Sequence, residues 1–171
     1  MTALRLTGSR VTLRSTTPAD AALLAPIRNE PEVRRWWSDL EPGEMDEFVA
    51  DECSLAIEVD GEVVGAVQFG EEEDPMYRHA NIDVYLTASR HGEGIGSEAV
   101  RLLARYLLEE RGHHRITIDP AASNAAAIRA YEKVGFRPVG VLREYERGPD
   151  GTWHDGLLLE LLTGDLIADS A

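Results

Sequence analysis

The sequence predicts an α+β fold in which helices flank a central mixed, twisted sheet, and three patterns along the chain lead to this prediction. Helical signals come early, over residues 17–52. A strand-turn-strand pattern follows over 54–68, where Asp60-Gly61 suits the tight turn of a hairpin. Strand and helix patterns then alternate as β-α-β-α-β over 81–142, and a helical crossover of this kind makes successive strands parallel.

Each element has a local signal. The early elements are a short strand at 11–14, a helix from Thr17-Pro18 to Ile27, a helical piece from Pro31 to about Trp36, and a weak helix at 45–52. The segment Asn81 to Leu86 alternates apolar and polar residues, which predicts a strand with one apolar face. The strongest helical spacing joins Ile95, Ala99, Leu102, Leu103, Tyr106 and Leu107, and Gly112 ends it. The later elements are a strand at 115–118, a helix capped by Ser123 and stopped by Gly135, and a hairpin of 136–147 and 152–162.

Length and composition set outer bounds. A chain of 171 residues predicts one domain spanning 1–171, and 43% hydrophobic residues argue against disorder. The single cysteine, Cys53, allows no internal disulfide and no cysteine-based zinc cage. No apolar run approaches the roughly 18 residues of a membrane span, and residues 1–10 lack the apolar stretch of a signal peptide. We therefore expect a cytoplasmic protein that has no membrane partner.

Negative charge is concentrated in one segment. The net charge is −14, and residues 36–77 hold 14 acidic residues and no lysine or arginine. The remaining 17 acids are balanced by all 17 basic residues of the chain. Such a field repels nucleic acid and attracts polycations, so we expect a cationic partner and no nucleic acid. A solvated surface that aids solubility explains the same charge equally well.

A glycine-rich turn precedes the strongest helix. It reads His91, Gly92, Glu93, Gly94, Ile95, Gly96 and Ser97. Alternating glycines let the backbone approach a ligand closely, and the helix N-terminus adds a positive dipole end, so a phosphate would bind well there. A flexible turn without a ligand is the alternative. The spacing does not match a dinucleotide fingerprint, and the Gly-Lys-Ser/Thr of a P-loop is absent.

A second group of polar residues follows the strand at 115–118. Asp119 lies at the end of that strand, and Asn124 and Tyr131 are seven residues apart, so they share one face of a helix. A carboxylate, an amide and a phenol could therefore line one cleft. The alternative is structural, with Asn124 as a helix cap and Tyr131 as a packed aromatic residue.

Together the two motifs resemble the GNAT superfamily of N-acetyltransferases, over roughly residues 54–145. The resemblance implies the GNAT fold with a β-α-β-α-β acyl-CoA-binding core and acetyl-CoA as co-substrate. It implies that residues 91–97 hold the CoA pyrophosphate, although His91 stands where the family usually has Gln or Arg. It further implies that Tyr85, Leu86 and Thr87 pair with the pantetheine arm, that Asn124 bonds that arm, and that Tyr131 lies near the thioester sulfur.

Within the superfamily, the sequence is most similar to aminoglycoside 6′-N-acetyltransferases. The shared features are the Trp36-Trp37 pair followed by acids, Glu71 to Pro75, Asn81-Ile-Asp83, and Asp119-Pro before Ser-Asn. The resemblance implies Trp36, Trp37, Glu73, Asp83 and Asp119 as acceptor-binding residues. The final hairpin also resembles protein N-terminal acetyltransferases, and a non-catalytic acyl-CoA-binding module is a third possibility. A monomer and a homodimer both remain open.

Acetyl transfer to an amine needs a neutral amine, a stabilised oxyanion and a proton for the leaving thiolate. We assign Asp119 as the base or amine-positioning group, with Asp83 as the second candidate for the base. Tyr131 is the expected acid, because a phenol is protonated at neutral pH. A strand amide near Tyr85 would serve the oxyanion. The five histidines show no metal-ligand spacing with nearby carboxylates, so we expect no metal.

Overall fold

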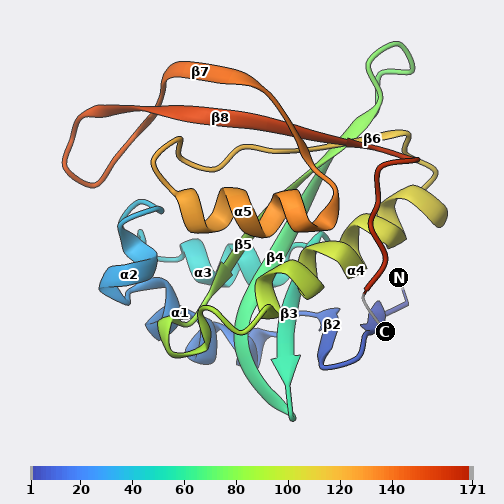
Figure 1. Cartoon of the computed structure of the whole chain (residues 1–171). Helices are drawn as coiled ribbons and strands as arrows, with labels where there is room; N and C mark the ends of the chain where they lie inside the picture. Colours follow the sequence, from blue (N-terminus) through green and yellow to red (C-terminus); the bar gives the residue numbers. More distant parts are fainter. Residues whose placement is uncertain (1, 170–171) are drawn as a thin grey trace.

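The computed structural model describes residues 2–169 and contains one mixed eight-stranded sheet in the order β1-β2-β3-β4-β5-β6-β8-β7 (Figure 1). The strands are β1 (Arg5–Thr7), β2 (Val11–Ser15), β3 (Ser54–Val59), β4 (Glu62–Glu72), β5 (His79–Leu86), β6 (Arg115–Ile118), β7 (Arg137–Arg147) and β8 (Trp153–Leu162). Among the described strands, only β5 and β6 pair in parallel, and every other neighbouring pair is antiparallel. The α+β class and the mixed sheet predicted from the sequence are confirmed.

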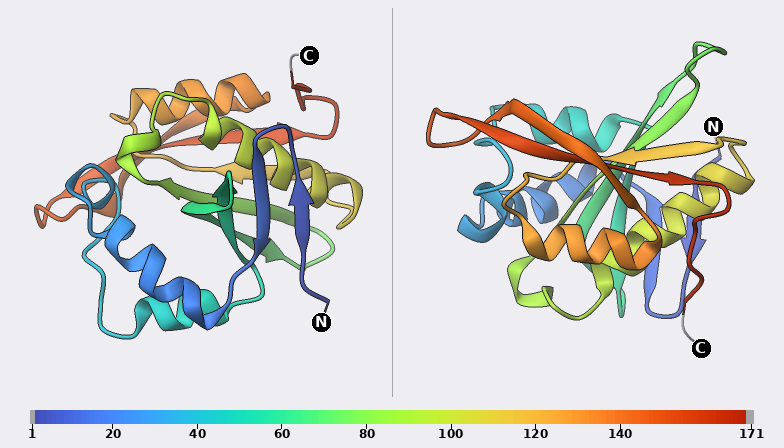
Figure 2. Two further views of the ribbon diagram at one scale, coloured as in Figure 1. Left: turned by 90° about the horizontal axis from the view of Figure 1, so that it is seen from below. Right: turned by 45° about the horizontal axis from the view of Figure 1, so that its top comes forward.

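Helices cover both faces of this sheet (Figure 2). They are α1 (Ala21–Arg28), α2 (Pro31–Arg34), α3 (Glu44–Ala50), α4 (Ile95–Glu109) and α5 (Ala125–Val134), with 3₁₀ turns at Pro18–Asp20 and Ala88–Arg90. The main core lies under α4 and α5, where Leu103 and Leu107 are fully buried. A smaller core, which includes Leu24 and Tyr85, lies under α1 and α3 on the opposite face. The two cores place successive residues of β5 on different sides of the sheet.

Strands β5 and β6 separate soon after they meet. Their parallel pairing comprises only Ala80 with Ile116 and Asn81 with Thr117. Beyond Asn81, β5 continues to Leu86 with its other edge still paired to β4. The edge of β5 that faces β6 is therefore open over 82–86, and both cores adjoin this opening.

The last hairpin, β7–β8, forms the other edge of the sheet. Nearly all of β7 is exposed, and within residues 2–169 it pairs with no strand except β8. Its register shifts between Leu142 and Glu146, and Glu144 adopts a positive φ of 46°. Such a bulge bends a strand and changes the direction of the side chains around it.

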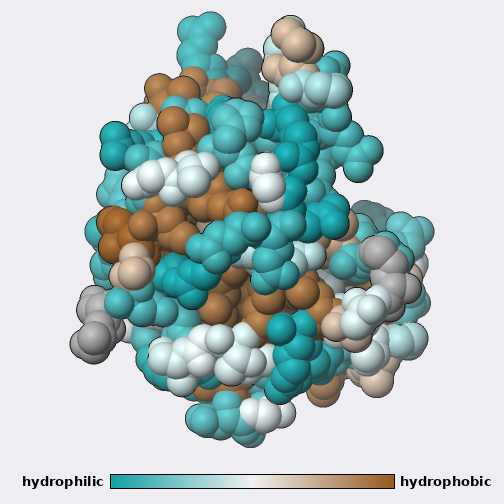
Figure 3. Space-filling view, turned by 90° about the vertical axis from the view of Figure 1, so that its right-hand side faces the viewer, coloured by the Kyte–Doolittle hydropathy of each residue, from teal (hydrophilic) through white to brown (hydrophobic). Residues whose placement is uncertain are grey.

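Local predictions from the sequence hold with few exceptions. The structure adds β1, which the sequence did not indicate, and extends β4 by four residues to Glu72. The N-cap of α5 is Asn124 and not Ser123, because the Asn124 side chain accepts a hydrogen bond from the Ala127 N–H. Among the described residues, no helix is long and apolar enough to cross a membrane. On the face shown in Figure 3, apolar patches are separated by polar residues.

Candidate active site

The glycine turn forms an open row of backbone donors at the start of α4. Gly92 and Gly94 have φ values of 78° and 80°. Residues with a Cβ adopt this left-handed backbone conformation only at a cost in free energy. Gly94 is the N-cap of α4, and no atom would lie within 4 Å of a Cβ built on Gly92, Gly94 or Gly96. Within residues 2–169, no acceptor bonds the N–H groups of 92–97. Unpaired donors at a helix N-terminus suit an anion such as pyrophosphate.

The open edge of β5 leads from this turn toward the centre of the sheet. The Thr87 N–H bonds the Val64 carbonyl on the β4 side, so the Leu86 backbone groups point to the open side. The Leu86 carbonyl there pairs with Nε2 of His91 at 2.8 Å. The His91 side chain therefore connects the start of the turn, where the phosphate is expected, to the strand edge, where the pantetheine arm is expected.

Thr87 and Tyr85 contribute less to that edge than the sequence analysis expects. The Thr87 N–H is already used by β4, and its hydroxyl donates to Glu30 at 2.6 Å. The Tyr85 ring lies in the smaller core, 5.4 Å from the ring of Trp37. The group free for a pantetheine arm is thus a backbone N–H that points between β5 and β6, such as that of Leu86, whose carbonyl already pairs with His91.

Asn124 and Tyr131 are positioned by α5 on the same side of the sheet as the glycine turn. The Asn124 side-chain oxygen caps the helix through the Ala127 N–H at 3.2 Å, which is the structural role that the sequence left open. Tyr131 is buried in the main core beside Phe136. Burial, with a smaller contribution from Asp83 and Asp119, raises the pKa of the Tyr131 phenol, so the phenol stays protonated at neutral pH.

A cleft of about 740 Å³ lies on the other side of the strand opening. Its lining residues come from β5, β6, β7, β8 and the segment after α2: Trp37, His79, Asn81, Ile82, Asp83, Arg115, Thr117, Asp119, Leu142, Tyr145, Glu146 and Leu158. Three carboxylates, Asp83, Asp119 and Glu146, meet here. The one arginine in the lining, Arg115, is already paired with Glu160 at 2.9 Å. The cleft therefore carries excess negative charge.

Among the carboxylates of the cleft, Asp83 has the largest shift in pKa. The side chain of Asp83 is exposed to the solvent in the cleft, but the walls of the cleft keep part of the bulk water away from it. Removal from bulk water, with Asp119 and Glu146 nearby, raises the pKa of Asp83 from 3.8 to about 6. Desolvation and Asp119 also raise the pKa of Glu146. Asp83 is thus a carboxylate that can gain or lose a proton near neutral pH.

The structure brings some expected acceptor residues together and leaves others apart. Asp83, Asp119 and Trp37 line the cleft. Trp36 does not, and Arg35 stacks on its ring at 4.4 Å. Glu73 is exposed in the β4–β5 loop, because β4 runs on to Glu72 and carries the turn beyond the sheet.

The sequence patterns did not indicate two of the cleft residues, Tyr145 and Glu146. The Tyr145 hydroxyl donates to the Asp119 carboxylate, which raises the pKa of that phenol to about 12. Both residues lie in the bulged part of β7, and the bulge breaks the alternation that would have indicated which side chains face inward. An aromatic residue flanked by two glutamates in a predicted strand was the available signal.

The acidic segment 36–77 does not supply the carboxylates of the cleft. Its acids Glu44, Glu47 and Asp51 line a neighbouring hollow of about 280 Å³, which shares Trp37 with the cleft. Tyr85 also lines this hollow. The acidic hollow thus adjoins the cleft and extends its negative character toward α3.

Residues 10–137 match the family model described as an acetyltransferase (GNAT) domain. The chain belongs to the GNAT acetyltransferase family. It is an N-acetyltransferase by family, and family members use acetyl-CoA. Within residues 2–169, no group of three or more His, Cys, Asp or Glu side chains could hold a metal ion.

The chain is similar to three proteins with different names. The chain is 32% identical to aminoglycoside N(6′)-acetyltransferase type 1 of Klebsiella pneumoniae over 164 residues, covering 82% of this chain and 79% of that one. The structure of Mycobacterium smegmatis RimJ in complex with CoA-disulfide superposes with a TM-score of 0.83 at 26% identity, covering 98% of this chain and 89% of that one. A kanamycin resistance protein of Rhizobium radiobacter is 42% identical over 82 residues, covering 47% of this chain and 70% of that one.

Proposed function

We propose that this GNAT enzyme transfers the acetyl group of acetyl-CoA to a primary amine of a polycationic small molecule, with the 6′-amine of an aminoglycoside as the first candidate. The observation that carries the proposal is the cleft in which Asp83, Asp119 and Glu146 meet without an unpaired arginine or lysine. A ligand with several ammonium groups would relieve this repulsion through charge-assisted hydrogen bonds. The relationship to an aminoglycoside N(6′)-acetyltransferase supports the same class of acceptor.

The cofactor would lie on the other side of the strand opening. The free N–H groups of 92–97 would bind its pyrophosphate, and the Leu86 backbone groups would lie along the pantetheine arm. The thioester would then reach the opening between β5 and β6, with the Tyr131 phenol on one side and the carboxylates on the other. Asn124 would orient the arm through the amide nitrogen that its capping role leaves free.

The chemistry follows from this placement. An ammonium cannot attack a thioester, so the acceptor must first lose a proton. Asp83, with a pKa of about 6, is the better proton acceptor, and Asp119 would hold the amine in place. The neutral amine would attack the thioester carbonyl, and a backbone N–H of β5 would stabilise the oxyanion. Collapse of this intermediate would break the C–S bond, the Tyr131 phenol would protonate the leaving thiolate, and the second proton lost by the amine nitrogen would restore the phenol. This assignment exchanges the order of Asp83 and Asp119 given by the sequence.

A second candidate is acetylation of a protein N-terminus. The observation that favours it is the structural similarity to RimJ over 98% of this chain, because neighbours of this kind are protein acetyltransferases. A peptide amine presents one ammonium group, whereas an aminoglycoside presents several. The number of carboxylates in the cleft therefore favours the small polycation.

One experiment separates the candidates. Purified protein is incubated with acetyl-CoA and either kanamycin, tobramycin, a polyamine or N-terminal peptides, and mass spectrometry identifies the acetylated product. We expect one acetyl group on the 6′-amine of the drug. Turnover on a peptide, with no acetylation at about millimolar drug, would refute the aminoglycoside.

A further inference from the structure

The bulge in β7 is held by a side chain of β8. Pairing with β8 is interrupted between Leu142 and Glu146, and the intervening Glu144 has a φ of 46°, which is unusual for a residue with a side chain. The Glu144 N–H, which the bulge would leave unpaired, donates to the Asp155 carboxylate at 2.8 Å. Because strained backbone persists only where its surroundings hold it, this bond maintains the bulge.

The residue that follows Glu144 packs against a glycine. Gly156 on β8 is buried, and a Cβ built on it would lie 2.9 Å from Cδ2 of Tyr145. A real Cβ would force the Tyr145 ring to move. Gly156 also forms an isolated bridge to Ala121, just after Asp119, which ties the hairpin to the segment that carries this carboxylate.

The ring thus directs the Tyr145 hydroxyl to Asp119. The hydroxyl donates to Oδ2 of the carboxylate. In the described chain, Oδ1 of Asp119 accepts no hydrogen bond, so one oxygen is occupied and the other is open to the cleft. A carboxylate held in this way has one orientation, whereas a free carboxylate rotates about its last torsion.

We propose that Tyr145 is a positioning residue, whose hydroxyl, set by the β7 bulge and by Gly156, orients Asp119 so that a single oxygen receives the acceptor amine. The inference rests on the proposed function, because it assumes that Asp119 contacts the acceptor. It gives the exposed edge hairpin a role in acceptor recognition. The groups that face the Tyr145 hydroxyl are Asp83 from β5, Asp119 after β6 and Glu146 from β7.

The first test is kinetic and uses whichever amine the panel identifies. Tyr145→Phe removes only the hydroxyl, and we expect kcat/KM for the acceptor to fall about 10-fold while the KM for acetyl-CoA stays unchanged. Gly156→Ala keeps the hydroxyl but displaces the ring, so it should cause a loss in the same direction. Tyr77→Phe, at a tyrosine 73% exposed in the β4–β5 loop, is the matched control and should have no effect.

A double-mutant cycle separates positioning from structural support. If Tyr145 acts through Asp119, Tyr145→Phe should add little in an Asp119→Asn background. Full additivity of the two losses, or wild-type kinetics for Tyr145→Phe, would overturn the proposal. A similar melting temperature for wild type and Tyr145→Phe would show that the fold is retained.

A third readout needs no acceptor. In protein labelled with ¹³C-tyrosine, the Tyr145 resonance, identified by its loss in Tyr145→Phe, should titrate with a pKa near 12 and at lower pH in Asp119→Asn. An unchanged titration in Asp119→Asn would overturn the contact and the proposal, even with an active enzyme. If no amine is acetylated although the titration shifts, the proposed function fails and the role of Tyr145 fails with it, while the contact stands.

Discussion

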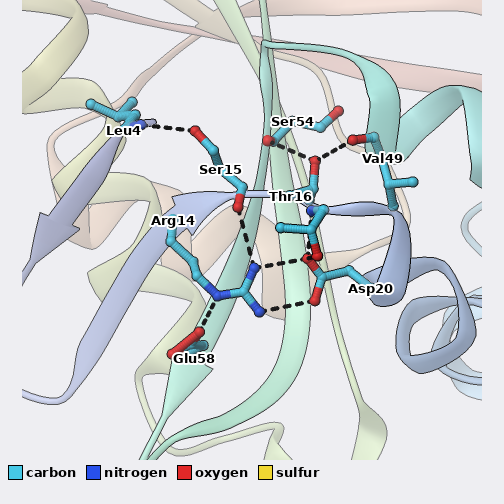
Figure 4. A network of polar contacts seen from close by, with 9 residues as sticks. Leu4, Arg14, Ser15, Thr16, Asp20, Val49, Ser54 and Glu58 are labelled. Carbon is cyan, nitrogen blue, oxygen red and sulfur yellow. Dashed lines mark hydrogen bonds and ion pairs between the residues drawn. The ribbon is translucent and has the colours of Figure 1, made fainter. Parts of the chain in front are cut away.

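Two clusters of charged side chains in this protein are built in opposite ways. At the start of the sheet, Arg14 donates to both oxygens of Asp20, at 2.8 and 2.9 Å, and also to Glu58 (Figure 4). The Asp20 carboxylate further accepts the Thr17 N–H, and Arg14 holds the pKa of Asp20 below its usual value. In the cleft, no cation of the part of the chain that the structure describes pairs with Asp83 or Glu146, and their pKa values are raised.

The contrast shows where the fold uses polar groups for stability and where it leaves them for a ligand. A buried charge that is fully paired supports the structure around it, while unpaired groups impose a free-energy cost. Within residues 2–169, the N–H groups of 92–97 without an acceptor and the cleft carboxylates without a cation lie on opposite sides of the opening between β5 and β6. Unsatisfied polar groups thus mark both halves of the proposed active site.

The largest effect is expected at the phenol between these two halves. Tyr131→Phe removes one proton donor and keeps the buried ring, so kcat should fall about 10²- to 10⁴-fold. The affinity for acetyl-CoA, measured by calorimetry, should stay nearly constant. Unchanged turnover would show that Tyr131 only packs and that the thiolate leaves unaided.

The unpaired N–H groups are tested by a matched pair of glycines. Gly94 and Gly43 are both left-handed N-caps, with φ of 80° and 84°, and neither has an atom within 4 Å of a Cβ position. Valine should strain both sites similarly, but only Gly94→Val should weaken acetyl-CoA binding, by about 100-fold or more, because the side chain would occupy the phosphate site. Equal affinities of the two variants in calorimetry would place the pyrophosphate elsewhere.

The paired cluster should matter for stability and not for catalysis. Arg14→Ala leaves Asp20, which is 2% exposed, without its cation, and we expect unfolding to become easier by about 2–4 kcal/mol. Chemical denaturation measures this change. Asp20→Asn should have a smaller cost, since it leaves no buried anion. A loss of acceptor specificity in Arg14→Ala, without a loss of stability, would contradict the division between the clusters.

Removal of a charge from the cleft should stabilise the fold, in contrast to removal of Arg14. The pKa of Asp83 is raised from 3.8 to about 6 by the fold, so its ionised form opposes folding, fully above pH 6 and hardly at all near pH 4. Asp83→Asn should therefore raise the melting temperature at pH 8 by a few degrees, with the gain discounted because solvent enters the cleft, and should raise it less at pH 4.5. Thermal scans at the two pH values measure the difference. A melting temperature that falls at pH 8 would mean that Asp83 is a stabilising group.

The sequence predicts the fold well where signals are local. Periodicity located β5 and α4, because each has an apolar face of regular spacing, and the Asp60-Gly61 turn located the β3–β4 hairpin. The three-residue β1 has too few residues for any period to appear. Asn124 and Ser123 are both good caps, and only the hydrogen bond to Ala127 distinguishes them.

The candidate site was predictable where its residues lie at element ends. Asp83, Asp119 and the glycine turn follow from their positions on β5, after β6 and before α4. Tyr145 could not be found in this way, because its orientation depends on a bulge held by Asp155 and on a glycine eleven residues later. Glu73 was expected near the acceptor because its acidic neighbours matched a motif, but the length of β4 places it at the exposed loop.

The most direct test of the unpaired cleft is the pH dependence of kcat/KM for the acceptor. If Asp83 accepts the proton of the amine, activity should fall as pH drops through an apparent pKa near 6, the macroscopic value of the carboxylate cluster. In Asp83→Asn this acid limb should disappear, and the remaining activity should be low. Full activity in Asp83→Asn, with the acid limb at the same pH as in the wild type, would show that Asp83 does not accept the proton of the amine.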